Sequence, residues 1–243
     1  MKIVSSYLTD NVTFGVFDFE TKFFFIHRTD IGLECWDLMT PLPMNRWTNS
    51  ETNILKAMIL LKDKKLVTGN KKGEIKFIDQ LTGKSLSKHK FFDSPIRHIL
   101  FTDNLVVLND KKMIFKISLV GKLIWDLTLP PDMRIIALSY SNDFLWVTFF
   151  AGMIFQIDNA SGVIIHKFVD LKNEIVSPIA IHRKWLVYSS PEFLNWFQLE
   201  NENMTSHLYI GDSIIRSFKA IEDGIIAGAD NGKLLFFTTP SIK

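Results

Sequence analysis

One short pattern recurs six times along the chain, and no other feature constrains the fold as strongly. The clearest copies are Gly-Glu-Ile-Lys-Phe-Ile-Asp at 73–79 and Gly-Met-Ile-Phe-Gln-Ile-Asp at 152–158. The copies are spaced 42, 39, 40, 40 and 40 residues apart, with starts at Ile31, Gly73, Lys112, Gly152, Glu192 and Gly232. A nearly constant period of about 40 residues indicates a repeat architecture in which each unit has the same local fold.

Each repeat unit contains four short segments that we expect to be strands, named a, b, c and d in chain order. An apolar residue opens strand b seven residues before each copy, at Phe24, Leu66, Leu105, Leu145, Trp185 and Ile225. Turn-forming residues, as in 70–73, separate strands b and c, which indicates a β-hairpin. A second turn precedes strand d, and the clearest of these turns contain Thr82-Gly83, Gly121 and Ser161-Gly162. Strand a is the earlier apolar run of the unit, as in 54–61, 96–101, 135–140 and 214–221.

Four antiparallel strands per unit of about 40 residues predict an all-β fold, a six-bladed β-propeller, because helical solenoids are the other common repeats of that length. We expect a single domain over residues 1–243, with blades anchored near 31, 73, 112, 152, 192 and 232. The last copy ends after its third strand, 234–238, whereas residues 2–8 precede the first unit's own strand a at 12–17. We therefore expect the N-terminal strand to complete the last blade, which leaves no free sheet edge.

The pattern Gly-x-Ile-x-x-Ile-Asp-x-x-Thr-Gly at 73–83 resembles WD-type and quinoprotein-like propeller repeats. The likeness covers almost the whole chain but concerns scaffold positions. The early Gly-His pair of WD repeats and the Trp girdle of quinoproteins are both missing. The strand-c residues Asp37, Asp79 and Asp158 are expected to cap the turns between strands c and d. The resemblance therefore implies a fold and does not identify an activity.

Composition excludes several kinds of site. Cys35 is the only cysteine, so neither an internal disulfide nor a cysteine metal site is expected. The formal net charge of +2 is too small to indicate nucleic-acid binding. Neither a signal peptide nor an apolar stretch of membrane-spanning length is present, so no membrane contact and a cytoplasmic location are expected.

The sequence contains no pattern typical of a catalytic or cofactor site, so we expect neither an enzyme nor a bound cofactor. The six histidines fall at different repeat offsets, with His27 assigned to a b–c turn, and they predict no metal site. One alternative remains open. Arg97, Arg134 and Arg216 lie near the inner strands, where they could contact an anion if the protein is a small-molecule binder or enzyme that uses the axial channel.

The favoured interpretation is a non-enzymatic scaffold or assembly subunit that binds protein partners through the propeller rim. We expect the b–c turns and the d–a connections to share one rim. The candidate partner-binding residues on that rim are Lys71, Lys72, Lys111, Lys112, Phe149 and Phe150. Two structural alternatives stay open: the lysines only solvate their turns, and strand b continues through the two phenylalanines into the hairpin.

Overall fold

The structure is a computed structural model, and it describes residues 12–18, 20–39, 44–50, 55–168, 174–177, 179–200, 203–211, 214–230 and 232–239. The chain divides into two compact units, unit 1 with residues 1–129 and unit 2 with residues 130–243. Within the described ranges every element is a β-strand, and 23 strands form six antiparallel sheets. The all-β prediction is therefore confirmed.

Unit 1 contains three sheets of four strands, each hydrogen-bonded in chain order. Sheet A comprises β1 (Val12–Phe17), β2 (Phe23–Arg28), β3 (Gly32–Asp37) and β4 (Met44–Asn49). Sheet B comprises β5 (Leu55–Leu60), β6 (Lys65–Asn70), β7 (Glu74–Asp79) and β8 (Ser85–Lys90). Sheet C comprises β9 (Ile96–Phe101), β10 (Leu105–Asn109), β11 (Met113–Ile117) and β12 (Leu123–Thr128).

Unit 2 contains two sheets of four strands and one of three in its described part. Sheet D comprises β13 (Ile135–Ser141), β14 (Phe144–Phe149), β15 (Met153–Asp158) and β16 (Ile164–Phe168). Sheet E comprises β17 (Ala180–His182), β18 (Trp185–Ser190), β19 (Phe193–Gln198) and β20 (Asn203–Tyr209). Sheet F comprises β21 (Ile215–Ile221), β22 (Gly224–Ala229) and β23 (Leu234–Thr238).

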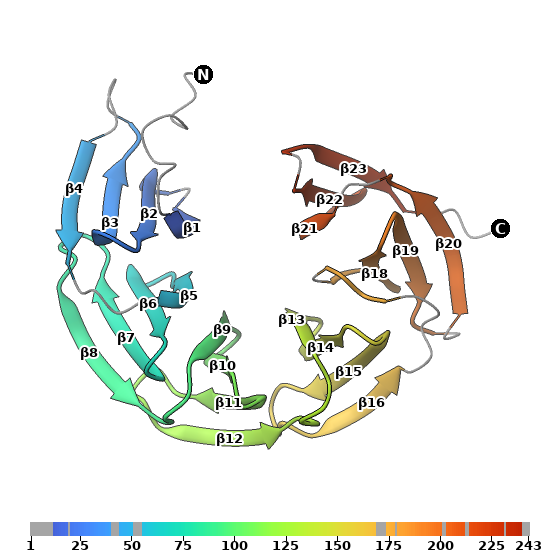
Figure 1. The fold of residues 1–243 in the computed structure, drawn as a ribbon, viewed down its shortest axis with the longest axis horizontal. Coiled ribbons are helices and arrows are strands. Elements are labelled where there is room, and N and C mark those ends of the chain that lie inside the picture. Colours follow the sequence, from blue (N-terminus) through green and yellow to red (C-terminus); the bar gives the residue numbers. More distant parts are fainter. Residues whose placement is uncertain are drawn as a thin grey trace. The chain divides into compact units, whose positions relative to one another are not determined.

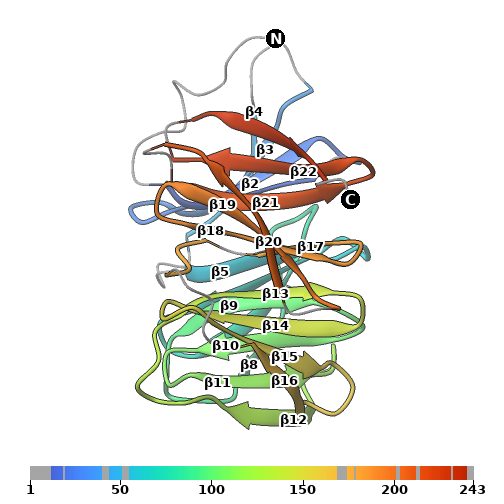
Figure 2. The same ribbon diagram turned by 90° about the vertical axis from the view of Figure 1, so that its right-hand side faces the viewer.

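Neighbouring sheets within a unit pack face to face through apolar side chains. In unit 1 the first strands β1, β5 and β9 lie side by side, and each sheet extends away from them toward its last strand (Figure 1). Ile75 and Phe77 of sheet B share one buried cluster with Ile99 and Val107 of sheet C. Figure 2 shows the twist of sheet E in unit 2, where β17 runs almost horizontally and β20 runs steeply across the view. The middle strands β6 and β10 are buried along almost their whole length, whereas the last strands β8 and β12 alternate between exposed and half-buried positions with the strand period of two.

The recurring start position is explained by the b–c turn. In sheets B, C, D and F the last turn residue donates its backbone N–H to the carbonyl of the last strand-b residue at 3.1–3.2 Å. The last turn residue has a positive φ in all four sheets, 75° at Gly73, 60° at Lys112, 74° at Gly152 and 80° at Gly232. A hairpin loop of this length ends in a left-handed residue, for which glycine is favoured. In the first copy the left-handed residue is Gly32, one position beyond Ile31.

The expected aspartate caps are confirmed. The carboxylate of Asp79 accepts hydrogen bonds from the backbone N–H and the hydroxyl of Thr82, both at 2.8 Å. Asp158 accepts the same pair from Ser161 at 2.7 and 2.6 Å. Asp37 accepts one from the backbone N–H of Met39 at 2.9 Å. These caps satisfy the backbone of the c–d turns and account for the recurring Asp without any catalytic role.

Sheet F differs from the other sheets at its last described strand. Leu234 and Phe236 of β23 are 71% and 70% exposed. Ile75 and Phe77 occupy the same repeat positions in sheet B and are 0% and 2% exposed. These two side chains of β23 are therefore exposed, unlike their counterparts in sheet B. Residues 2–8, the predicted fourth strand of the last blade, lie outside the described residues, and the closed six-bladed ring stays a prediction.

Candidate functional site

The b–c turns and the connection between sheets B and C form one continuous surface in unit 1. A Cβ atom on Gly73 would lie 2.0 Å from the carbonyl oxygen of Phe92 and 2.7 Å from that of Ser94. The next turn is joined to the same connection, because the N–H of Asp110 donates to the carbonyl of Pro95 at 2.9 Å. The predicted sharing of one rim by b–c turns and d–a connections is thus confirmed here.

Buried asparagines hold the two turns in place. The side-chain oxygen of Asn70 accepts hydrogen bonds from the N–H groups of Lys72 and Glu74 at 2.9 and 3.1 Å. Its amide donates to the carboxylate of Glu74 at 2.8 Å, and that carboxylate also pairs with Lys88 at 2.6 Å. Asn109 ends strand b of sheet C in the same way and accepts from the N–H of Met113 at 3.0 Å. The lysines of these turns therefore project from a fixed backbone.

Bulges in the first strands add two cationic residues beside these turns. The pairing register shifts by one residue between Leu55 and Ala57, which makes Lys56 the bulged residue of β5. The corresponding shift in β9 makes Arg97 the bulged residue. A bulge redirects the extra side chain out of the regular alternation. We call the turn 71–73, the loop 91–95, the turn 110–112 and the two bulged residues together the basic rim.

The basic rim is cationic and exposed. Its described residues include six basic side chains, Lys56, Lys71, Lys72, Arg97, Lys111 and Lys112, but only two acidic ones, Asp93 and Asp110. Lys71, Lys72 and Lys111 are exposed, whereas Lys112 is half-buried. The Arg97 guanidinium forms an ion pair with Asp110 while 61% of its side chain stays exposed. Asp93 pairs with Lys90 at 2.5 Å. The hydrogen bond from Lys90, and the charges of Lys90 and Lys111, lower the pKa of the Asp93 carboxyl.

The placement of the two phenylalanines requires one correction. Phe149 is the last residue of β14 and is 0% exposed, with its ring 4.8 Å from that of Phe155 in an edge-to-face contact. Strand b thus continues through Phe149, so the prediction of a surface role for this ring is wrong. Phe150 is half-buried, and the guanidinium of Arg134 lies over its ring at 5.0 Å. A partner role for Phe150 in unit 2 stays a prediction.

The three arginines of the alternative interpretation each contact a group of their own sheet. Arg97 contacts Asp110, and Arg216, a bulged residue of β21, lies 3.6 Å from the carboxylate of Asp230. Arg134 lies just before β13 and covers Phe150. Arg97 belongs to unit 1 and the other two to unit 2, so their predicted joint contact with an anion stays a prediction.

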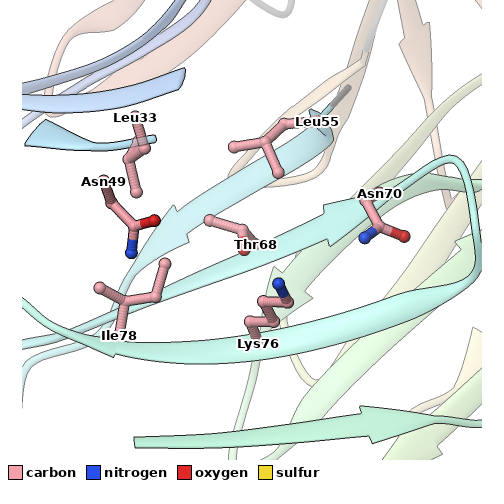
Figure 3. Close-up of a pocket in the computed structure, with 7 residues that line it drawn as sticks. All are labelled: Leu33, Asn49, Leu55, Thr68, Asn70, Lys76 and Ile78. Carbon is pink, nitrogen blue, oxygen red and sulfur yellow. The ribbon is translucent and has the colours of Figure 1, made fainter. Parts of the chain in front are cut away.

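A cavity between sheets A and B of unit 1 is too small for a substrate. It measures about 20 Å³, which is room for about one water molecule. The lining residues are Leu33, Asn49, Leu55, Thr68, Asn70, Lys76 and Ile78. Figure 3 shows the ammonium group of Lys76 pointing toward the part of the cavity lined by Thr68 and Asn70. Burial, and then the charge of Lys88, lower the pKa of Lys76. Drug-sized ligands occupy cavities of about 300 Å³ or more, so this cavity is not a candidate active site.

Other kinds of site find no support in the part of the chain that the structure describes. No group of three or more His, Cys, Asp or Glu residues there could hold a metal ion. His27 lies in strand β2 and is 1% exposed, so its expected position in a turn is wrong. The same ranges contain no helix with the length and hydropathy that a membrane crossing requires.

Several solved structures share the fold at low sequence identity. A chain of a crystal structure of the Mitotic Checkpoint Complex matches with a TM-score of 0.74 and 9% identity, over 95% of this chain and 76% of that one. Sqt1 from Saccharomyces cerevisiae matches with a TM-score of 0.70 and 15% identity, over 90% and 69% of the two chains. BamB from Moraxella catarrhalis matches with a TM-score of 0.60 and 15% identity, over 93% and 72%.

These similar structures include WD40-type and other β-propeller proteins, so they support a propeller fold for this chain. No family model matches the sequence, and no curated protein matches it significantly. At identities of 9–15% the likeness concerns the fold alone.

Proposed function

We propose that this protein is a non-enzymatic interaction module of the β-propeller type, which binds a protein partner on the basic rim of unit 1. The observation that carries the proposal is the positive charge of that rim, which contains six basic and two acidic side chains. Asn70 and Asn109 hold its two turns in place. Exposed polar residues on a rigid scaffold are typical of binding surfaces.

The comparisons support this proposal at the level of the fold. One of the similar chains comes from the crystal structure of a multiprotein assembly, the Mitotic Checkpoint Complex. The loops at the basic rim are short, with three residues in each b–c turn and five between β8 and β9. Short loops leave little room for a substrate pocket, whereas an exposed rim suits a partner that lies across it.

Affinity purification with charge-reversed variants tests the proposal. The test variant combines Lys71→Glu, Lys72→Glu and Lys111→Glu, all exposed residues of the basic rim. The matched control combines Lys62→Glu, Lys84→Glu and Lys122→Glu, which are exposed residues in the a–b and c–d turns at the other end of the same sheets. Both variants change the net charge equally, so a partner of the basic rim is lost only from the first. Equal recovery of every partner with both variants would contradict the proposed site.

A further inference from the structure

We propose that the basic rim recognises an extended acidic segment of its partner protein. This inference rests on the proposed function and adds the chemistry of the ligand. Its starting point is the distribution of the cations over two neighbouring sheets: Lys71 and Lys72 belong to sheet B, whereas Arg97 and Lys111 belong to sheet C. A single bound carboxylate would not use both sets.

The spacing of the sheets sets the length of the segment. Packed sheets lie about 10 Å apart, and an extended chain covers that distance in about three residues. In an extended segment alternate side chains point the same way. Carboxylates two and four residues apart can therefore reach turn 71–73 and turn 110–112 at once. The bulged Lys56 and Arg97 lie on the adjacent strands β5 and β9, so they add positive charge along the strand-a side of the same segment.

The rim already contains two weak internal competitors for such a segment. Asp110 pairs with Arg97, and Asp93 pairs with Lys90, yet the side chains of Arg97 and Asp93 are 61% and 85% exposed. Exposed ion pairs are weak, so an incoming carboxylate can replace either aspartate at little cost. Removing the charge of Asp110 should therefore strengthen the binding of an acidic ligand. If Asp110 were itself a binding residue, removing its charge would weaken binding instead.

The aromatic residues of the rim argue against single-stranded nucleic acid as the ligand. Nucleic-acid grooves combine cations with exposed rings on which bases stack. Phe91 and Phe92 are half-buried, and their rings lie 6.0 and 4.6 Å from that of Phe115 in the core of sheet C. Because both rings pack against Phe115, they are not the exposed faces on which bases stack. Carboxylates need no such stacking faces.

Fluorescence anisotropy of the full chain with a labelled octa-glutamate peptide tests the inference. Wild type should bind at 50 mM NaCl and more weakly at 200 mM. Each rim charge contributes about a twofold to fivefold change in affinity. The Lys71→Glu, Lys72→Glu, Lys111→Glu variant should therefore lose affinity tenfold or more, and the same triple change to Gln should lose less, because it removes the charges without reversing them. Asp110→Asn should bind about two to five times more tightly, and the Lys62, Lys84, Lys122 control should lose less than the rim variant.

The outcomes separate this inference from the proposed function. Equal losses in the rim variant and the control would overturn it, since the binding would then reflect net charge alone. So would tighter binding of an octathymidine oligonucleotide than of octa-glutamate with the same variant pattern. If partners depend on the rim lysines in the affinity purification but octa-glutamate neither binds nor competes, only the acidic ligand is wrong. If no partner depends on them, the proposed function itself fails.

Discussion

Gly73 offers a test of how tightly the basic rim is built. Its φ of +75° is a conformation that costs a residue with a Cβ about 1–2 kcal/mol. A Cβ at this position would also approach the carbonyl oxygens of Phe92 and Ser94 to 2.0 and 2.7 Å. Both contacts involve backbone atoms, which cannot move aside as the end of a flexible side chain can. Shifting the packed backbone to make room lowers the free energy of unfolding by about a further 1–3 kcal/mol.

Gly232 provides the matched control for the substitution Gly73→Ala. It ends a b–c turn with nearly the same φ, +80°, and its N–H makes the same hydrogen bond, to Ala229 at 3.1 Å. A Cβ at Gly232 would meet no heavy atom within 4 Å. Gly232→Ala should therefore lose only the conformational cost of about 1–2 kcal/mol, whereas Gly73→Ala should lose about 2–5 kcal/mol.

Urea unfolding followed by tryptophan fluorescence measures the difference, with the slope of each transition compared to identify any change in the unfolded state. The larger loss with Gly73→Ala should be accompanied by weaker partner recovery, because loop 91–95 must move. If both alanine variants lose the same free energy of unfolding, the close approach of loop 91–95 to turn 71–73 does not limit this position, and the reasoning is refuted.

Three further predictions concern the paired carboxylates, the buried cysteine and the predicted closing strand. Hydrogen bonds from Arg46, Lys88 and Thr82 lower the pKa values of Asp37, Glu74 and Asp79, respectively. The three ionised carboxylates therefore stabilise the fold above their ordinary pKa values of 3.8 and 4.5, and this contribution should be lost as the pH falls through the lower folded values. Acid titration followed by circular dichroism should show unfolding below about pH 4. Burial raises the pKa of the Cys35 thiol to about 12, so at pH 8 a thiol reagent such as DTNB should react with it only after urea is added, and fast labelling of the native protein would contradict this. Deletion of residues 2–8 should lower the urea midpoint and cause self-association through the unpaired edge of β23, whereas unchanged gel filtration and stability would refute the predicted closing strand.

The strands and turns could be predicted from the sequence because the repeat fixes both hydrophobic period and turn chemistry. The run 96–101 and the segment 234–238 coincide with β9 and β23, and the predicted strand at 12–17 coincides with β1. The expected caps at Asp79 and Asp158 follow from short-range geometry that a sequence displays directly. The arrangement of the repeat units relative to one another cannot be predicted in this way, because it depends on packing between residues far apart in the sequence.

The candidate site was harder to predict, for reasons that individual residues make clear. Phe149 looked like a turn residue because Phe150 and Gly152 follow it, yet its backbone continues β14 and its ring packs on Phe155. The bulges at Lys56 and Arg97 depend on pairing register, which the apolar pattern does not reveal. The pair of Arg97 with Asp110 spans 13 residues and becomes visible only when β9 and β10 are placed side by side.

The basic rim shows how a repeat scaffold can acquire a specific surface without changing its framework. The first residue of the b–c turn is Lys71, Asp110, Phe150 and Asp230 in sheets B, C, D and F, while the closing backbone hydrogen bond of the turn stays at 3.1–3.2 Å. Because the framework tolerates a cation, an anion or an aromatic ring at this position, the scaffold does not select the residue. In two sheets the bulged residue of strand a carries the opposite charge to the first turn residue, since Arg97 pairs with Asp110 and Arg216 pairs with Asp230. In sheet B the corresponding residues, Lys71 and Lys56, have the same charge and cannot neutralise each other, so the cationic surplus of the rim is greatest there, where an acidic segment should make its strongest contacts.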